Sequence, residues 1–157
     1  MISQLMPIIE ANHARVSIKS DPANAEWTLI GDRFYWDQVF FNLIENALKQ
    51  NPEPGLNIKV RFYEENGRYV ISISDDGIGI PSADVPLVFK RFYRVEKHHA
   101  QHKTPGTGLG LSIVKRAIEA HHGTISLTSE PGRKTEFIIS IPATRLVGSS
   151  QPADRNR

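Results

Sequence analysis

An alternating stretch that stops abruptly constrains the fold of this chain more than any other feature. Residues 69–74 alternate apolar and polar side chains, which is typical of a half-buried strand, and Asp75-Asp76-Gly77-Ile78-Gly79 follows at once. Glycine permits backbone dihedrals and close approaches that a β-carbon forbids. A carboxylate held beside such bare backbone can therefore accept a hydrogen bond from a flat donor edge, such as the amino group of a purine. Taken alone, the Asp-Gly pair favours the simpler interpretation of a tight turn.

The hydrophobic patterns on either side predict a single mixed α+β domain. We expect helices within residues 1–13 (beginning near Pro7), over 33–50 (capped by Asp32), from Ser82 toward Phe89, and over 109–122 (with Gly123 as the left-handed terminal residue). We expect strands over 15–19 and 26–30, and hairpins over 56–75 and 124–141. Half-buried alternation in both hairpins indicates an open sheet face or edge, with helices on the other face.

The composition is that of an ordinary soluble domain. The 157 residues are 39% hydrophobic and 23% charged, with a net charge of +2 and no cysteine. The absence of cysteine excludes disulfides and thiolate metal sites, and no apolar run is long enough to cross a membrane. A net charge this small gives no argument for binding nucleic acid or anionic lipid.

The long predicted helix carries polar side chains that suit a phosphate ligand. Asn42, Asn46 and Lys49 stand at positions i, i+4 and i+7 and so share one face beside the apolar face. An Asn amide oxygen can join a magnesium shell that phosphates and water complete, and a lysine is a point charge for phosphate. A solvated helix face is the simpler alternative.

Three glycines at alternate positions precede the last predicted helix. Gly106, Gly108 and Gly110 leave backbone N–H groups bare next to a helix N-terminus, which together can bind an anion. The run is not a Walker A loop, because no Gly-Lys-Ser/Thr follows, and it is a poor Rossmann fingerprint, because a long basic segment rather than a strand precedes it. A flexible hinge is the alternative.

In their order and spacing, four motifs closely resemble the ATP-binding catalytic domain of sensor histidine kinases, within the gyrase–Hsp90–histidine kinase–MutL superfamily. The motifs are NLIENALK, DDGIGIP, VFKRFYRVE and GTGLGLSIVK, and the resemblance spans roughly residues 30–142. It implies the Bergerat fold, a two-layer α/β (α+β) sandwich with a mixed sheet covered on one face by helices. It also implies an ATP-binding domain over residues 14–143 and a junction helix over 1–13 from a missing dimerisation domain. Residues 144–157 are expected to form a disordered tail, because they are polar.

The resemblance also implies a role for each matching residue. Asn46 is the expected magnesium ligand, Asn42 and Lys49 are expected to act in catalysis beside the phosphates, and Asp75 is expected to bind the adenine amino group. Further ATP contacts are expected from Gly77 and Gly79 beside the base, from Phe89 and Phe92 as aromatic anchors of a lid over 93–107, from Arg94 and Lys103, and from Gly106, Thr107, Gly108, Leu109 and Gly110. The implied ligands are ATP and Mg²⁺.

One substitution favours a kinase over an ATPase. The ATPase members carry a water-activating glutamate where this chain has Asn42, and Glu45 is expected to point away from the site. We therefore expect transfer of the γ-phosphoryl to a histidine on a separate phosphoacceptor and dimerisation domain, and from there to a response regulator. A gyrase- or Hsp90-like ATPase, a serine-directed anti-sigma-type kinase and a non-catalytic interaction module that kept the fold and lost the nucleotide are the alternatives.

The remaining expectations concern departures from the family pattern and the setting of the domain. Gln50 stands where the family often has an aromatic residue or histidine, and His13 lies in a context unlike a phosphoacceptor block. The histidines at 98, 99 and 102 are expected to be solvated lid residues rather than a metal site. We expect a monomeric, cytoplasmic domain that binds no nucleic acid.

Overall fold

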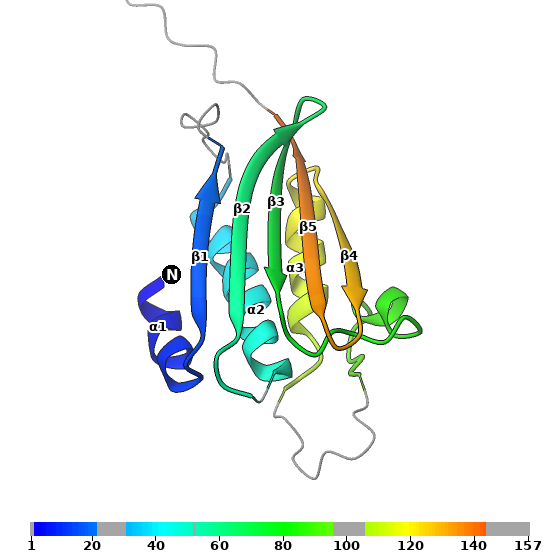
Figure 1. Cartoon of the computed structure of the whole chain (residues 1–157). Coiled ribbons are helices and arrows are strands. Elements are labelled where there is room, and N and C mark those ends of the chain that lie inside the picture. Colours follow the sequence, from blue (N-terminus) through cyan, green and yellow to red (C-terminus); the bar gives the residue numbers. More distant parts are fainter. Residues whose placement is uncertain (1, 22–30, 52, 96–105, 144–157) are drawn as a thin grey trace, which may run out of the picture.

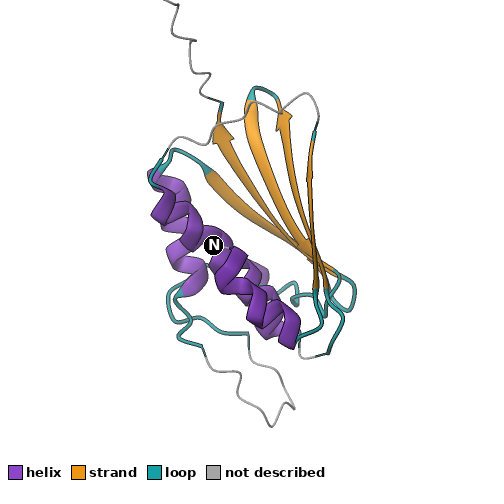
Figure 2. Cartoon of the chain, turned by 90° about the vertical axis from the view of Figure 1, so that its left-hand side faces the viewer, coloured by secondary structure: helices purple, strands orange, loops and turns teal. Residues whose placement is uncertain are grey.

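Two layers make up the fold, with helices on one side and a sheet on the other (Figure 2). The computed structural model describes residues 2–21, 31–51, 53–95 and 106–143. Its helices are α1 (Ile2–Ala11), α2 (Arg33–Gln50) and α3 (Gly110–Ala120), with a short 3-10 turn, η2 (Val85–Leu87). Its strands are β1 (Arg15–Ser20), β2 (Asn57–Glu65), β3 (Arg68–Asp75), β4 (Thr124–Glu130) and β5 (Lys134–Pro142). The predicted two-layer α/β architecture is confirmed.

The sheet is mixed and has the strand order β1-β2-β3-β5-β4 (Figure 1). Strand β1 runs parallel to β2, whereas the other three pairs are antiparallel. The predicted turn of the first hairpin is confirmed, since Asn66 and Gly67 both have positive φ, as a two-residue hairpin turn requires. Because β3 lies between β2 and β5, it ends at the centre of the sheet edge and brings Asp75 there.

Strand β3 is more buried than its alternating sequence suggests. Residues 69–75 are all buried, so the expected half-buried pattern is wrong for this strand. The reason lies on the face that the helices leave uncovered, where Ser72 donates to Glu136 and long side chains of β2 and β5 extend over the strand. Strands β2 and β4 do keep exposed alternate positions.

The core lies between the helices and the inner face of the sheet. Asp32 caps α2 by accepting a hydrogen bond from Phe34 N at 2.8 Å, as predicted. The predicted apolar face of α2 is buried against the sheet: it consists of Phe40, Leu43, Ile44, Ala47 and Leu48, joined by Trp36 and Val39. Val114 and Ile118 of α3 complete the helix layer. This packing fixes both helices against the strands that end at the candidate site.

The first helix differs from the prediction in its start. It runs from Ile2 to Ala11 through Pro7, rather than beginning near Pro7. Within a helix, Pro7 removes only the hydrogen bond to the carbonyl of residue 3 in the first turns, and burial of Leu5, which is 1% exposed, supports the helix. Since Leu5 belongs to the core, α1 packs with the rest of the domain, while a boundary near residue 14 stays a prediction.

Two further local predictions are wrong. Ser82 caps no helix, because Pro81–Asp84 form turns and only η2 follows, with Pro86 in its first turn. The left-handed residue after α3 is His122 rather than Gly123. Gly123 is needed for space, since a β-carbon there would lie 2.9 Å from Ile118 Cγ2. The strand expected over 26–30 lies outside the described residues.

Candidate functional site

Asp75 closes β3 and turns its carboxylate back onto the chain that follows. The carboxylate is 7% exposed, and its Oδ1 accepts a hydrogen bond from Gly77 N at 3.0 Å. Among the described residues, none donates a hydrogen bond to Oδ2. The protein thus holds one oxygen, and the other can accept a hydrogen bond from a ligand.

Asn51 connects this strand end to the end of helix α2. Its Nδ2 donates to Ala47 O at 2.7 Å and approaches Asp75 Oδ1 at 3.5 Å, and its Oδ1 accepts from Ile78 N at 2.7 Å. In the sequence, Asn51 merely follows the predicted helix over 33–50. What could have revealed its role is the Asp-x-Gly turn, because a glycine there indicates that another group occupies the place of a side chain.

The two glycines after Asp75 make room for protein groups in this structure. A β-carbon on Gly77 would collide with the side-chain amide of Asn51, and one on Gly79, which has φ of 69°, would collide with the Glu130 carbonyl. Their expected contacts with an adenine base stay a prediction. Their demonstrable task is to let the loop pack against Asn51 and the turn after β4.

The two adjacent aspartates have opposite electrostatic environments. Burial raises the pKa of Asp75 to about 6, against the lowering effect of the Gly77 hydrogen bond and with the help of the neighbouring Asp76 charge. For Asp76, partial burial works in the same direction, but hydrogen bonds from the side chain and backbone of Asn57 outweigh it and lower the pKa. Asp76 therefore fixes the start of β2, and Asp75 is the carboxylate available for a ligand.

The polar face of α2 follows the prediction in part. Asn46 is half-buried, and its side chain makes no hydrogen bond with any described residue. The side chain of Asn42 donates to Gln38 O, four residues earlier, at 2.8 Å. Lys49 pairs with Glu45 at 2.8 Å, while the expectation that Glu45 points away from the site stays a prediction. The two side chains meet because residues i and i+4 are neighbours on a helix surface.

The glycine run places the start of α3 against α2. A β-carbon on Gly110 would lie 2.9 Å from Asn42 Oδ1, so the first residue of α3 lies directly beside the Asn42 side chain of α2. No side chain caps α3 at Leu109, although Thr107 Oγ1 accepts from Leu109 N at 3.3 Å. The first N–H groups of α3 thus remain available to an anion.

The two ends of the predicted lid meet through the backbone. Phe92 N donates to Gly108 O at 2.9 Å, and both residues have positive φ. Phe89 packs on the core edge-on to Phe137, as expected of an anchor, but the ring of Phe92 is 67% exposed and does not anchor by burial. Arg94 interacts with another group of the protein, and Lys103 lies outside the described residues. The expected phosphate contacts of both residues stay predictions.

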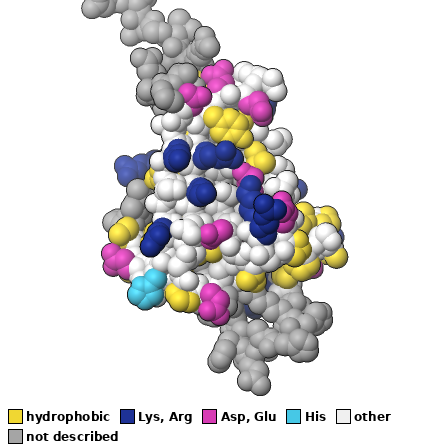
Figure 3. Space-filling model, viewed as in Figure 1, with side chains coloured by type: hydrophobic (Ala, Val, Ile, Leu, Met, Phe, Trp, Pro, Cys, Tyr) yellow, Lys and Arg dark blue, Asp and Glu magenta, His cyan; other side chains and the backbone are white. Residues whose placement is uncertain are grey.

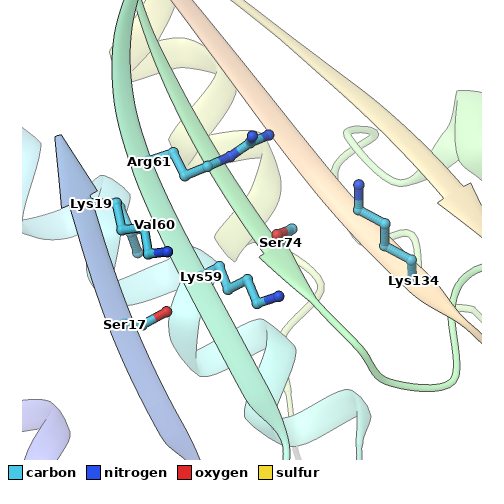
Figure 4. A pocket seen from close by; sticks show the side chains of 7 residues that line it. All are labelled: Ser17, Lys19, Lys59, Val60, Arg61, Ser74 and Lys134. Carbon is cyan, nitrogen blue, oxygen red and sulfur yellow. The ribbon is translucent and has the colours of Figure 1, made fainter. Parts of the chain in front are cut away.

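A separate basic hollow lies on the sheet face that the helices leave uncovered (Figure 3). Its volume is about 430 Å³, and Figure 4 shows the residues that line it, which are Ser17, Lys19, Lys59, Val60, Arg61, Ser74 and Lys134. Glu136 neutralises part of its charge, because it pairs with Arg61 at 3.1 Å and with Lys134 at 2.7 Å. The hollow faces away from α2 and α3, so it is distinct from the site at the strand end.

The described residues contain neither a cluster of metal-binding side chains nor a helix that could span a membrane. Within the described part of the chain, no cluster of three or more histidine, cysteine, aspartate or glutamate side chains could hold a metal ion. The histidines at 98, 99 and 102 lie outside that part, so their expected role stays a prediction. Among the described helices, none combines the length and the apolar character that crossing a bilayer requires.

Comparisons with known proteins agree with this geometry. Residues 31–145 match the family described as histidine kinase-, DNA gyrase B-, and HSP90-like ATPases. The chain is 38% identical over 135 residues to the sensor protein RprX of Bacteroides fragilis, covering 85% of this chain and 25% of RprX. It is 45% identical over 106 residues to the sensor histidine kinase WalK of Bacillus subtilis, covering 67% of this chain and 17% of WalK.

Solved structures show the same architecture. The mycobacterial sensor histidine kinase MprB superposes with a TM-score of 0.71 at 30% identity, covering 90% of each chain. The catalytic domain of histidine kinase ThkA superposes with a TM-score of 0.73 at 27% identity, covering 89% of this chain and 86% of ThkA. The chain spans only about a quarter of RprX and less of WalK, so it matches one part of those longer proteins.

Proposed function

The chain belongs to the family of histidine kinase-, DNA gyrase B- and HSP90-like ATPases, and from this premise we propose that it is the ATP-binding catalytic domain of a sensor histidine kinase. In this role it binds Mg-ATP and supplies the γ-phosphoryl to a histidine on a phosphoacceptor and dimerisation domain. That domain passes the phosphoryl group to an aspartate of a response regulator. A cytoplasmic location and a monomeric state of the isolated domain belong to the same proposal, as does the absence of nucleic acid binding.

The observation that carries the proposal is the arrangement of polar groups along α2. Asn51, at the end of α2, contacts the Asp75 carboxylate, and Asn46 lies five residues earlier, about 7 Å along the helix axis. Asn42 lies one turn further on and faces the start of α3. The Asp75 carboxylate, expected to bind the adenine, thus lies beside the C-terminal end of α2, and the groups expected to face the phosphates lie about one to three turns earlier on the same rigid helix.

Each site residue has a definite task in this proposal. Asp75 Oδ2 accepts a hydrogen bond from the adenine amino group, and the N–H groups at the start of α3 donate hydrogen bonds to phosphate oxygens. Lys49, which is exposed and paired only with Glu45, can turn toward the phosphates. The half-buried Asn46 amide has no partner among the described residues, which fits a ligand for Mg²⁺. The bound ion would neutralise phosphate charge.

The carboxylates of α2 favour transfer over hydrolysis. Asn42 cannot accept a proton as a general base, and its amide is held by Gln38 O. The two carboxylates on this helix are both paired, Asp37 with Arg33 and Glu45 with Lys49. Because residue 42 offers no base to activate water, the imidazole of a supplied acceptor becomes the nucleophile, since phosphoryl transfer depends mainly on positioning and charge. The gyrase-like ATPase alternative lacks such a base here.

A transfer assay tests the proposal. The domain is incubated with γ-labelled Mg-ATP, with and without a purified histidine-bearing dimerisation domain of a related sensor kinase such as WalK. We expect label on the acceptor histidine and only slow release of inorganic phosphate. Rapid phosphate release without an acceptor, and no label with one, would favour the ATPase alternative.

A further inference from the structure

Asn51 is a buried polar residue that directly follows α2 and contacts the loop after Asp75. Its side chain is 6% exposed, and it follows the last residue of α2 in an extended conformation. A buried amide must satisfy its donors and its acceptor, since leaving them unpaired is costly. Its contacts therefore show what the residue is built to hold.

The hydrogen bonds of Asn51 determine which way its amide points. Its nitrogen donates to a carbonyl, Ala47 O, at 2.7 Å, and its oxygen accepts from an N–H group, Ile78 N, at 2.7 Å. Neither partner could exchange roles, so only this orientation satisfies both. It directs the second N–H of the amide toward Asp75 Oδ1, 3.5 Å away.

The result is a carboxylate whose two oxygens differ. Oδ1 of Asp75 is approached by Gly77 N and by the Asn51 amide, whereas Oδ2 receives no hydrogen bond from any described residue. Gly77 can take its position only because it has no side chain where the Asn51 amide lies. Asn51 thus holds the loop that supplies one donor and is itself the other.

We propose that Asn51 is a specificity-determining positioning residue, which orients the Asp75 carboxylate so that the nucleotide site selects a purine with a 6-amino group. This inference rests on the proposed function and deepens it. Asn51 acts through Asp75 and need not touch the base. If it were only a structural residue, its loss would weaken the binding of every nucleotide equally. If it orients Asp75, its loss weakens chiefly the ligands that carry the amino group.

The test compares two ligands that differ by that group alone, ATP and purine riboside 5′-triphosphate, both with Mg²⁺. Calorimetric titrations are made on the wild type, Asn51→Ala and the isosteric Asn51→Asp. Asn12→Ala is the matched control, because Asn12 makes the same bond to the carbonyl four residues earlier, at 2.7 Å, at the end of α1. Thermal melts of all four proteins record loss of stability separately.

We expect the wild type to prefer ATP by about 10- to 100-fold, the effect of one hydrogen bond to a charged group. Asn51→Ala should reduce this preference to less than about threefold and leave affinity for the purine analogue within about twofold. Asn51→Asp keeps the acceptor for Ile78 N but removes the donor, so it should lose the preference even if Asn51→Ala fails to fold. Asn12→Ala should keep the full preference.

Two results would count against the inference, and they can be told apart. A parallel loss of affinity for both ligands in the folded Asn51 variants, with the ATP preference kept, would overturn the positioning role and leave the proposed function standing. Failure of the wild type to bind ATP, or equal binding of both ligands, would overturn the proposed adenine site and the inference with it.

Discussion

Asp75 is buried, and its carboxyl group accepts a hydrogen bond from an amino group most strongly when it is ionised. Burial raises its pKa to about 6, so at neutral pH most molecules carry the ionised form and at pH 5 most carry the neutral acid. An ordinary surface aspartate would not change state in this range. In the proposed site, the residue that binds the base is therefore also the group that makes ATP binding sensitive to mild acid.

ATP affinity should accordingly fall as the pH is lowered through about 6, because the protonated carboxyl has lost its charge as an acceptor. Calorimetric titrations between pH 5 and pH 8 measure this. Purine riboside 5′-triphosphate is the control, since its phosphates titrate in the same way and it has no amino group to lose. If the ratio of the two affinities were constant over this range, the ionised form of Asp75 would not be the adenine acceptor.

Among the residues of the candidate site, Asp75 stands out in the sequence and Asn51 does not. An acid at the end of a strand followed by two glycines is unusual enough to stand out. Asn51 lies before Pro52 in a stretch that simply ends a helix, so nothing local distinguishes it. Its partners Asp75 and Ile78 are more than twenty residues away, and only the packing of α2 beside β3 brings them together.

At the scale of elements, the contact between Phe92 and Gly108 closes the segment that would cover the phosphates. Gly108 has φ of 70°, and a β-carbon there would lie 2.9 Å from backbone atoms of Phe92. Gly67, in the turn between β2 and β3, has the same φ of 70° but open space around it. A β-carbon would strain the backbone at both glycines, but only at Gly108 would it also collide with a neighbour.

Replacing each glycine by alanine should give different results. Both variants should lose about 1–2 kcal/mol of unfolding free energy, the cost of a left-handed residue with a β-carbon. Only Gly108→Ala should also weaken Mg-ATP binding, by at least about tenfold, since it displaces Phe92 from Gly108. Urea unfolding and calorimetry measure the two effects. Equal ATP affinity in both variants would show that this closure does not serve the nucleotide.

Most elements could be predicted because their hydrophobic periods are clear, as in α2 and the two hairpins. The errors fall where tertiary contacts overrule local preference. The α1 helix tolerates Pro7 because Leu5 is buried, and β3 is buried on both faces because side chains of its neighbours cover its serines. Along α2, Glu45 pairs with Lys49, although the sequence pattern grouped Lys49 only with Asn42 and Asn46.

At the scale of the whole molecule, α1 contributes to the same core as the sheet. Leu5→Ala should destabilise the domain by about 2–4 kcal/mol, because the side chain is 1% exposed. Met6, its neighbour in the same helix, is 40% exposed, so Met6→Ala should cost less than about 1 kcal/mol. Urea unfolding measures both. A negligible effect of Leu5→Ala would mean that the folded unit begins after α1, near the predicted boundary at residue 14.

The uncovered sheet face should be independent of the nucleotide site. Lys19 and Lys59 line the basic hollow there, on the opposite side of the sheet from α2 (Figure 4). Lys19→Ala and Lys59→Ala should leave Mg-ATP affinity within about twofold of the wild type, because charges this exposed are screened by solvent. Calorimetry of both variants checks this. A loss of about tenfold or more in either variant would indicate that the phosphates bind on the uncovered face of the sheet.

The central claim is that a nucleoside triphosphate binds at the end of β3 with its base at Asp75. The most direct measurement is calorimetric titration of ATP at pH 7.5, with and without Mg²⁺, into the wild type and Asp75→Asn. We expect the wild type to bind ATP more tightly with Mg²⁺ than without it, and Asp75→Asn to bind with an affinity at least about tenfold lower. Equal affinities in the two proteins, or no binding by the wild type, would contradict it.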